Sequence, residues 1–421
     1  MKTLSFISTV FALASTSFIL FGCSTDDSAT NDVDQEETVS FEVLIYPEQY
    51  DPGTNGIVLI SDTNGTIKEQ VNYDLSQGTI VNSTFQGSQD EHYTVTVLSA
   101  LTSPEQNIYL LHSSLDVPPG NYIYGNELQD LTTHSIDVTM LGVLNDDGTP
   151  TYPFNYSPII YSGTYYSDSF IFNTVVEDGA PFYAAFKRDS DAYPRYYWRE
   201  NVNNDVSEVF EYASLPEATD IITMEWPENT TSNIAAYGYL NGNDTQVSLA
   251  SKYFDLNEMG HDFYTVHSLF DYFIYSVNFE TGNKFYNHVE YSEESTFIAQ
   301  NPNFDFSLSS FSSGAFQLET TGSFTGFQAT SVINNPEDNF YLIHHMYGSA
   351  ETTINVDEGV LMSAILDAIN APSEPTELEL KTVSTFMDTR IDGDGMYSMF
   401  TDEAVAPPAI GDTYQSIRLE L

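Results

Sequence analysis

Residues 39–46 read Val-Ser-Phe-Glu-Val-Leu-Ile-Tyr, in which apolar side chains first alternate with polar ones and then run on unbroken. Alternation with a period of two puts the apolar side chains on one face of an extended strand. Comparable runs, rich in β-branched and aromatic residues, recur at 93–98, 169–176 and 376–380. Because such residues favour strands over helices, they predict β-structure along the whole chain.

Turn signals separate these runs. They are Asp51-Pro52-Gly53, Asn64-Gly65, Pro119-Gly120-Asn121, Asp146-Asp147-Gly148, Asn241-Gly242 and Asp392-Gly393-Asp394-Gly395. Each combines residue types that accept the backbone of a tight turn. Only residues 359–370 place apolar side chains at helical spacing. We therefore predict an all-β protein of tandem antiparallel β-sandwich domains, with at most one or two short helices.

The pattern from 39 to 142 is compact, with strands joined by short turns and a Pro-Pro-Gly-Asn-Tyr segment (118–122) leading into another strand. This pattern resembles an immunoglobulin-like or carboxypeptidase-regulatory-like sandwich of roughly a hundred residues. The polar segment 145–150 is the most linker-like break. We expect an immunoglobulin-like sandwich over 39–142, a β-rich domain over 151–300, and another with one short helix over 301–421. No repeat of fixed period is visible after residue 150, which argues against a propeller.

The N-terminus has the order of a secretory signal peptide: Met1-Lys2, an uncharged and largely apolar stretch from 3 to 22, and then Cys23. Serine and threonine interrupt the apolar run, which is typical of a cleaved segment and not of a membrane span. Leu20-Phe21-Gly22-Cys23 resembles the lipobox of bacterial lipoproteins, although Phe21 is larger than usual there. The resemblance implies removal of residues 1–22 and lipidation of Cys23. Cys23 is the only cysteine, so no disulfide is expected.

Residues 24–37 are polar and acidic, and a segment of this composition cannot bury enough surface to fold. We expect residues 23–38 to form a lipidated tether. Carboxylates behind the lipidated cysteine resemble the signal that sends lipoproteins of Bacteroidota to the outer face of the outer membrane. The resemblance covers the N-terminal 37 residues or so and implies a lipid-anchored protein exposed at the cell surface.

The composition is strongly acidic, with 61 acidic residues against 11 basic ones and a formal net charge of −50. This charge excludes an electrostatic nucleic-acid binder. Disorder is not expected, because 41% of the residues are hydrophobic and 29 tyrosines and 28 phenylalanines can supply a core. Such acidity suits a secreted protein in salt water, or one that carries calcium.

Motifs of common enzymes are absent from the sequence. It contains no His-Glu-x-x-His, Gly-x-Ser-x-Gly, Ser-x-x-Lys, phosphate loop or Gly-x-Gly-x-x-Gly. A cysteine nucleophile is excluded because Cys23 is the expected anchor. A pair of catalytic carboxylates, as in glycoside hydrolysis, stays open but cannot be located among 61 candidates.

Two groups of residues are weak candidates for metal ligands. Histidines and aspartates cluster at His261-Asp262, His267 and Asp271, but no known ligand spacing fits and aromatic residues lie among them. His344 and His345 follow a strand, so their rings should point to opposite faces. We interpret both groups as structural.

Asp388, Asp392 and Asp394, followed by Gly395, partly resemble a calcium loop, with oxygen donors at alternate positions. Arg390 stands where a ligand would be needed, and no glutamate closes the loop. An ordinary Asp-Gly turn explains the same residues and is the interpretation we favour. No cofactor is expected unless calcium binds here.

Four of the basic residues lie within thirteen positions: Lys187, Arg188, Arg195 and Arg199. Aromatic runs at 182–186 and 193–198 flank them, and Asp189-Ser190-Asp191 offers a turn between two strands. Guanidinium groups beside flat rings suit an acidic sugar, so the ligand-binding hypothesis comprises Lys187, Arg188, Arg195, Tyr197, Trp198 and Arg199. The simpler explanation, which we favour, is that the cations pair with Asp189, Asp191 and Glu200 while the aromatics form core.

These observations favour a cell-surface lipoprotein that acts as a binding or adhesion module for polysaccharide, without catalysis. One alternative is a secreted hydrolase with a carboxylate pair that acts on polysaccharide. Another is a structural subunit that assembles with other envelope proteins. The expected partners are therefore the membrane, through the lipid on Cys23, and a polysaccharide or envelope proteins, with nucleic acid excluded.

Overall fold

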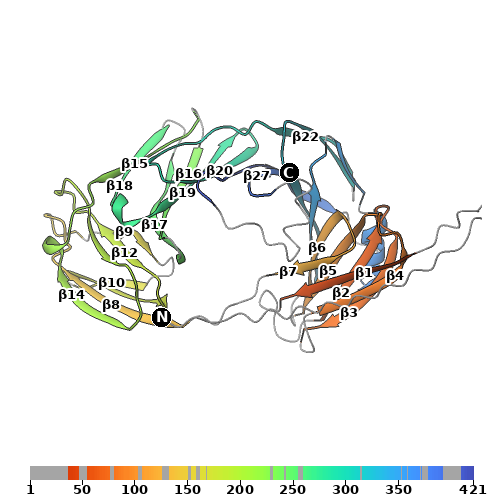
Figure 1. Ribbon diagram of the computed structural model, residues 1–421, viewed down its shortest axis with the longest axis horizontal. Helices are drawn as coiled ribbons and strands as arrows, with labels where there is room; N and C mark the ends of the chain where they lie inside the picture. The colour runs from red at the N-terminus through yellow and green to blue at the C-terminus, as the bar shows by residue number, and fades with distance from the viewer. Residues whose placement is uncertain are drawn as a thin grey trace, which may run out of the picture.

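The computed structural model describes residues 37–46, 55–75, 80–102, 107–125, 132–149, 153–157, 162–166, 168–227, 231–240, 243–254, 259–312, 315–351, 353–357, 359–369, 371, 378–391 and 409–421. Within these ranges the chain forms 28 strands and one α-helix. The strands build four two-layered β-sandwiches, which follow an arch in the order second, third, fourth, first (Figure 1). The predicted all-β class of tandem immunoglobulin-like sandwiches is confirmed.

The first sandwich contains β1 (Glu37–Ile45), β2 (Asn55–Asp62), β3 (Ile67–Asp74), β4 (Ile80–Gly87), β5 (Tyr93–Thr102), β6 (Asn107–Val117) and β7 (Asn121–Tyr124). A small sheet, β4-β1-β7, packs on the strands β3-β2-β5-β6. The alternation that predicted β1 is real, because Val39, Phe41, Val43 and Ile45 are all buried in the core between the two layers.

The second sandwich contains β8 (Thr133–Leu141), β9 (Pro153–Ser157), β10 (Ser162–Tyr166), β11 (Ser169–Glu177), β12 (Phe182–Phe186), β13 (Arg195–Arg199) and β14 (Val206–Glu211). Its sheets are β10-β11-β8-β14 and β13-β12-β9. Phenylalanines dominate the core between them; for example, the rings of Phe170 and Phe172 lie edge to face at 4.8 Å between centroids.

The third sandwich contains β15 (Asp220–Glu225), β16 (Thr231–Leu240), β17 (Asn243–Phe254), β18 (Gly260–Thr265), β19 (Tyr272–Thr281), β20 (Lys284–Ser292) and β21 (Thr296–Ile298). The fourth contains β22 (Asp305–Ser312), β23 (Ala315–Thr321), β24 (Gly326–Asn335), β25 (Phe340–Ser349), β26 (Thr353–Asp357), β27 (Glu379–Asp388) and β28 (Thr413–Glu420). Their small sheets are β18-β15-β21 and β22-β23-β26.

The sandwiches share one connectivity. In the first three, the first strand lies between the fourth strand, which runs antiparallel to it, and the seventh, which runs parallel. In the fourth sandwich β23 takes the central place beside β26, and β22 occupies the seventh position in antiparallel orientation. The architecture therefore repeats four times although the sequence shows no fixed period.

The strand pairings correct the predicted domain boundaries. β8 lies within the expected first domain, 39–142, yet it pairs with β11 and β14 of the second sandwich. The segment read as a linker is a turn inside that sandwich, because the backbone N–H of Asn145 donates to the carbonyl of Thr149. The expected domain 151–300 contains the larger part of two sandwiches. Polar composition misled the prediction because a tight turn and a linker use the same residue types.

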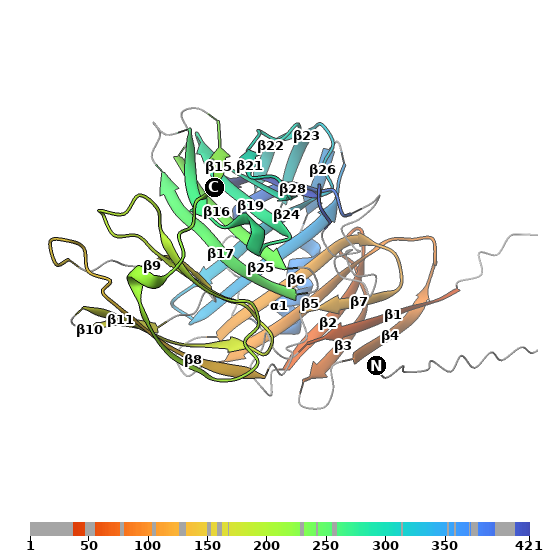
Figure 2. The same cartoon turned by 60° about the vertical axis from the view of Figure 1, so that its left-hand side comes forward.

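Three of the four sandwiches share a single twelve-stranded sheet, β17-β16-β19-β20-β28-β27-β24-β25-β6-β5-β2-β3. Antiparallel pairing of β20 with β28 joins the third sandwich to the fourth. Parallel pairing of β25 with β6 joins the fourth to the first, and Figure 2 shows β25, β6 and β5 side by side. This sheet turns the separate sandwiches into one body.

The second sandwich is attached by packing. All five residues of β12 are buried. Phe182, Ala184 and Phe186 face its own core, whereas Tyr183 and Ala185 face the core of the third sandwich. A strand buried on both faces reads as continuously apolar, which is why Phe-Tyr-Ala-Ala-Phe shows no alternation.

The predicted helix is confirmed as α1 (Gly359–Ala368). Its residues Leu361, Met362 and Ile365 pack on the outer side of β2, β5 and β6, together with side chains of β25. In the part of the chain described here, no helix has the length and apolar character needed to cross a bilayer.

Candidate functional site

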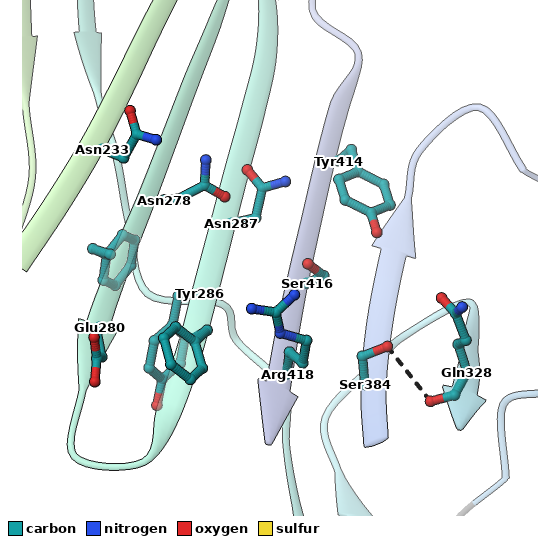
Figure 3. Close-up of a pocket in the computed structure, with 12 residues that line it drawn as sticks. Asn233, Asn278, Glu280, Tyr286, Asn287, Gln328, Ser384, Tyr414, Ser416 and Arg418 are labelled. Atoms are coloured by element: carbon teal, nitrogen blue, oxygen red, sulfur yellow. Dashed lines mark hydrogen bonds between the residues drawn. The ribbon is translucent and has the colours of Figure 1, made fainter. Parts of the chain in front are cut away.

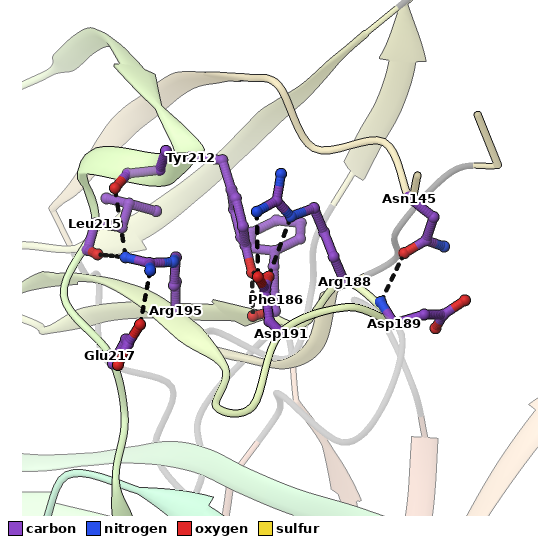
Figure 4. A network of polar contacts seen from close by, with 10 residues as sticks. Asn145, Phe186, Arg188, Asp189, Asp191, Arg195, Tyr212, Leu215 and Glu217 are labelled. Atoms are coloured by element: carbon purple, nitrogen blue, oxygen red, sulfur yellow. Dashed lines mark hydrogen bonds and ion pairs between the residues drawn. The ribbon is translucent and has the colours of Figure 1, made fainter. Parts of the chain in front are cut away.

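The predicted basic hairpin forms, but its cations are engaged within the protein (Figure 4). The Arg188 guanidinium donates to both carboxylate oxygens of Asp191 at 3.1 Å and lies 4.7 Å from the centre of the Tyr212 ring. Arg195 donates to the carbonyl of Leu215 and to the carboxylate of Glu217, each at 2.7 Å. Both arginines therefore tie the hairpin to the rest of the second sandwich.

The remaining hairpin residues are also engaged. Arg199 donates to one oxygen of Glu208 at 2.8 Å, and the Tyr197 hydroxyl donates to the other at 2.9 Å. Trp198 packs against the third sandwich core, and the Lys187 ammonium lies 5.2 Å from the centre of the Tyr264 ring. The pairing partners differ in part from those expected, since Asp191 is used but Glu208 and Glu217 replace Glu200. This arrangement favours the structural interpretation of the hairpin.

Of the three possible calcium ligands, the structure describes only Asp388. Asp388 is buried, and its Oδ1 accepts hydrogen bonds from the backbone N–H and the Nε of Arg390, at 3.0 and 2.8 Å. Asp392 and Asp394 lie outside the described residues, as does Cys23. Among the described residues no group of three or more histidine, cysteine or acidic side chains could hold a metal ion. Arg390 is thus the partner that the structure gives to Asp388.

Polar side chains also cluster on a second surface, for which the sequence predicted no function. In the third and fourth sandwiches one face of the twelve-stranded sheet packs into the cores through residues such as Val277, Phe279 and Ile417. The intervening side chains lie on the opposite face and are exposed or half-buried there, as for Asn278 and Ser416. We call this surface the open face.

Two rows of side chains cross the open face from strand to strand. The amide row consists of residues paired directly between β16, β19, β20 and β28: Asn233, Asn278, Asn287 and Ser416. The arginine row runs beside it from β19 to β25: Glu280, Phe285, Arg418, Ser384, Gln328 and Tyr347. Side chains paired directly across strands lie about 5 Å apart, so each row is continuous.

The two rows line a hollow of about 380 Å³ at the junction of the third and fourth sandwiches (Figure 3). Asn233, Asn278 and Asn287 lie on three adjacent strands, with Tyr414 beyond them (Figure 3). Burial raises the pKa of the Tyr414 hydroxyl, which therefore stays protonated and can donate a hydrogen bond. The hollow is within the size range of small-ligand sites.

Arg418 is the cation at the centre of this surface. Its guanidinium lies 5.1 Å from the centre of the Phe285 ring and is paired with Glu420 at 2.9 Å. The side chains of Arg418 and Glu420 are both half exposed, at 50% and 51%. The guanidinium and ring together form a flat, partly polar platform on the open face.

The first sandwich closes one end of the open face. Val97 faces the first core and is paired with His112, which is paired in turn with His345. These residues share the side of the sheet that carries the arginine row, because His345 is paired with Thr330 on β24. The small sheet β4-β1-β7 therefore stands on the same side as the hollow. As predicted, His344 points the other way, where it lies 2.7 Å from the Ser113 hydroxyl.

Sequence reasoning missed the open face because its residues are spread over seven strands between 233 and 418 and form no local motif. The available signal was alternation, as in Val277-Asn278-Phe279-Glu280, which marks one face as polar. Which polar faces meet depends on the pairing of β20 with β28. That pairing joins segments more than a hundred residues apart.

No family model matches the sequence, and no curated protein matches it significantly. Among solved structures, the N-terminal four immunoglobulin domains of Dscam1 isoform 6.9 match with 11% identity over 92% of this chain and 97% of that one, at a TM-score of 0.16. Two B repeat units of the collagen-binding protein of Staphylococcus aureus match with 10% identity over 86% and 97%, at a TM-score of 0.13. At TM-scores this low, the matches support neither a fold nor a function for this chain. The fold assignment rests on the strand pairings.

Proposed function

We propose that this protein is a carbohydrate-binding module held at a membrane surface by lipid on Cys23. The observation that carries the proposal is the pair of rows on the open face. Amides and hydroxyls each offer donors and acceptors, which is what a surface needs to match sugar hydroxyl groups. The Phe285 and Tyr347 rings add flat apolar area beside them, suited to the apolar face of a sugar ring.

Binding fits this surface better than hydrolysis does. Of the twelve described residues that line the hollow, only Glu280 carries a carboxylate. Glycoside hydrolysis ordinarily uses two carboxylates on opposite sides of the scissile bond. The two rows supply many groups that can bind sugar hydroxyls, but the described residues that line the hollow include no pair of carboxylates.

The amide row provides the test. We expect the Asn278→Ala, Asn287→Ala double variant to lose retardation by polysaccharide in affinity electrophoresis, with affinity reduced about tenfold or more. Each lost hydrogen bond costs about 1 kcal/mol, and two such losses reach that factor. Asn173→Ala is the matched control, because Asn173 is exposed on β11 of the second sandwich. Equal retardation of the double variant and the control would refute the proposal for this face.

Membrane attachment has its own test. We expect Cys23→Ser to move the protein from the membrane fraction to the soluble fraction, because acyl chains on one residue supply the anchoring energy, about 0.8 kcal/mol for each buried methylene. Fractionation and a mass shift of the wild-type N-terminal peptide by the lipid would check this. An unlipidated wild-type peptide would contradict the proposed anchor.

A further inference from the structure

The charge around the open face restricts what it can bind. One of the 11 basic residues is Lys2, and eight of the other ten form ion pairs with carboxylates: Lys68, Arg188, Arg195, Arg199, Lys284, Lys381, Arg390 and Arg418. The cation on the open face, Arg418, already has Glu420 beside it. An acidic ligand would have to displace Glu420 and approach a chain of net charge −50.

The two rows also define a direction. Their side chains that line the hollow lie on β16, β19, β20, β28, β27 and β24, which are six neighbouring strands of one sheet. Neighbouring strands are about 4.8 Å apart, so the lined surface extends over roughly 24 Å across the strands. Along each strand, by contrast, the rows are two residues apart, as Asn278 and Glu280 are on β19. The surface is therefore a long, narrow track.

We propose that the ligand of the open face is an uncharged polysaccharide that lies across the strands and occupies about five sugar units, since each ring of an extended glycan spans roughly one strand spacing. This inference rests on the proposed function and names its ligand class. The amide row and the hydroxyls of Ser384 and Ser416 hydrogen-bond the sugar hydroxyls. The Arg418 guanidinium, held on the Phe285 ring and neutralised by Glu420, provides a platform and further donors instead of a counter-charge.

The test uses the wild-type full chain in detergent, run by affinity electrophoresis through gels that contain single neutral or acidic polysaccharides. Retardation by a neutral polymer, undiminished at high salt, is the expected result. Retardation by acidic polymers alone would overturn the inference while leaving carbohydrate binding intact. If no polymer retards the protein, the proposed function fails as well.

Two further measurements sharpen the result. In calorimetry with oligosaccharides of the retarding polymer, affinity should rise with length up to about five sugar units and then level off. A plateau at one or two units would contradict the track. Arg418→Gln removes the charge together with the guanidinium platform, so it should lower the affinity for the neutral glycan by the same factor at low and at high salt. A loss that is large at low salt and disappears at high salt, with unchanged thermal unfolding, would show that the charge itself binds the ligand.

Discussion

Replacing Ala185 with glutamate is expected to lower the free energy of unfolding by about 3–5 kcal/mol, because an unpaired charge would be buried between two cores. Ala185 is fully buried on β12 and faces the core of the third sandwich. Solvent cannot reach the carboxylate, and a loss of this size approaches the total stability of many domains. The substitution should separate or unfold the second and third sandwiches.

Tryptophan fluorescence during urea unfolding measures this effect directly. The chain has two tryptophans, and both report on the affected core, since Trp226 is buried in it and Trp198 packs against it. Val209→Glu is the matched control because Val209 is 66% exposed on β14. The control should change stability by about 0.5 kcal/mol or less. Equal midpoints for the two variants would show that β12 is not enclosed as described.

Stability should fall steeply as the pH drops from about 6.5 to 4. Burial lowers the pKa of His112 to about 4, with smaller contributions from the neighbouring His345 and His344, and burial alone lowers the pKa of His288 to about 4. His288 must be neutral in the fold, because its Nδ1 accepts a hydrogen bond from the backbone N–H of Gln300 at 3.1 Å. Both rings therefore resist protonation while the protein is folded.

In the unfolded chain the same rings take up protons near pH 6.5. Between pH 6.5 and 4 the unfolded state thus binds more protons, so stability is fully present above 6.5 and is lost as the pH falls. The lowered pKa of each histidine corresponds to about 3 kcal/mol. Glu290 acts in the opposite direction, because burial raises its pKa, and offsets part of the loss.

Urea unfolding at a series of pH values checks this expectation. The His112→Gln, His288→Gln double variant should lose most of the pH dependence between 6.5 and 4. His92→Gln serves as the control, because His92 is half exposed, at 46%. If the double variant is as sensitive to acid as the control, the histidines are not the cause.

How much the sequence could predict depended on the distance between interacting residues. Alternation in 39–46 predicted β1, and helical spacing predicted α1, because each pattern is complete within a dozen residues. The hairpin of β12 and β13 was also visible, with its Asp189-Ser190-Asp191 turn. Local patterns of this kind need no knowledge of tertiary structure.

Pairings between distant segments could not be predicted in this way. β8 looked like the end of the first domain because nothing in its local sequence shows which sandwich the strand joins. Arg195 pairs with Glu217, and Arg199 pairs with Glu208. Both glutamates lie outside the hairpin, so these pairings could not be predicted from its sequence. The open face was hidden for the same reason, since its two halves meet only where β20 pairs with β28.

The parallel pairing of β6 with β25 also determines how tension would cross the molecule. A polymer held on the open face pulls on the third and fourth sandwiches, and the proposed anchor pulls on the first through β1. Eight residue pairs between β25 and β6 join the fourth sandwich to the first along this path. The second sandwich lies outside this path of force. A load that enters at β1 therefore passes through the core of the first sandwich into the twelve-stranded sheet and reaches the open face within that sheet.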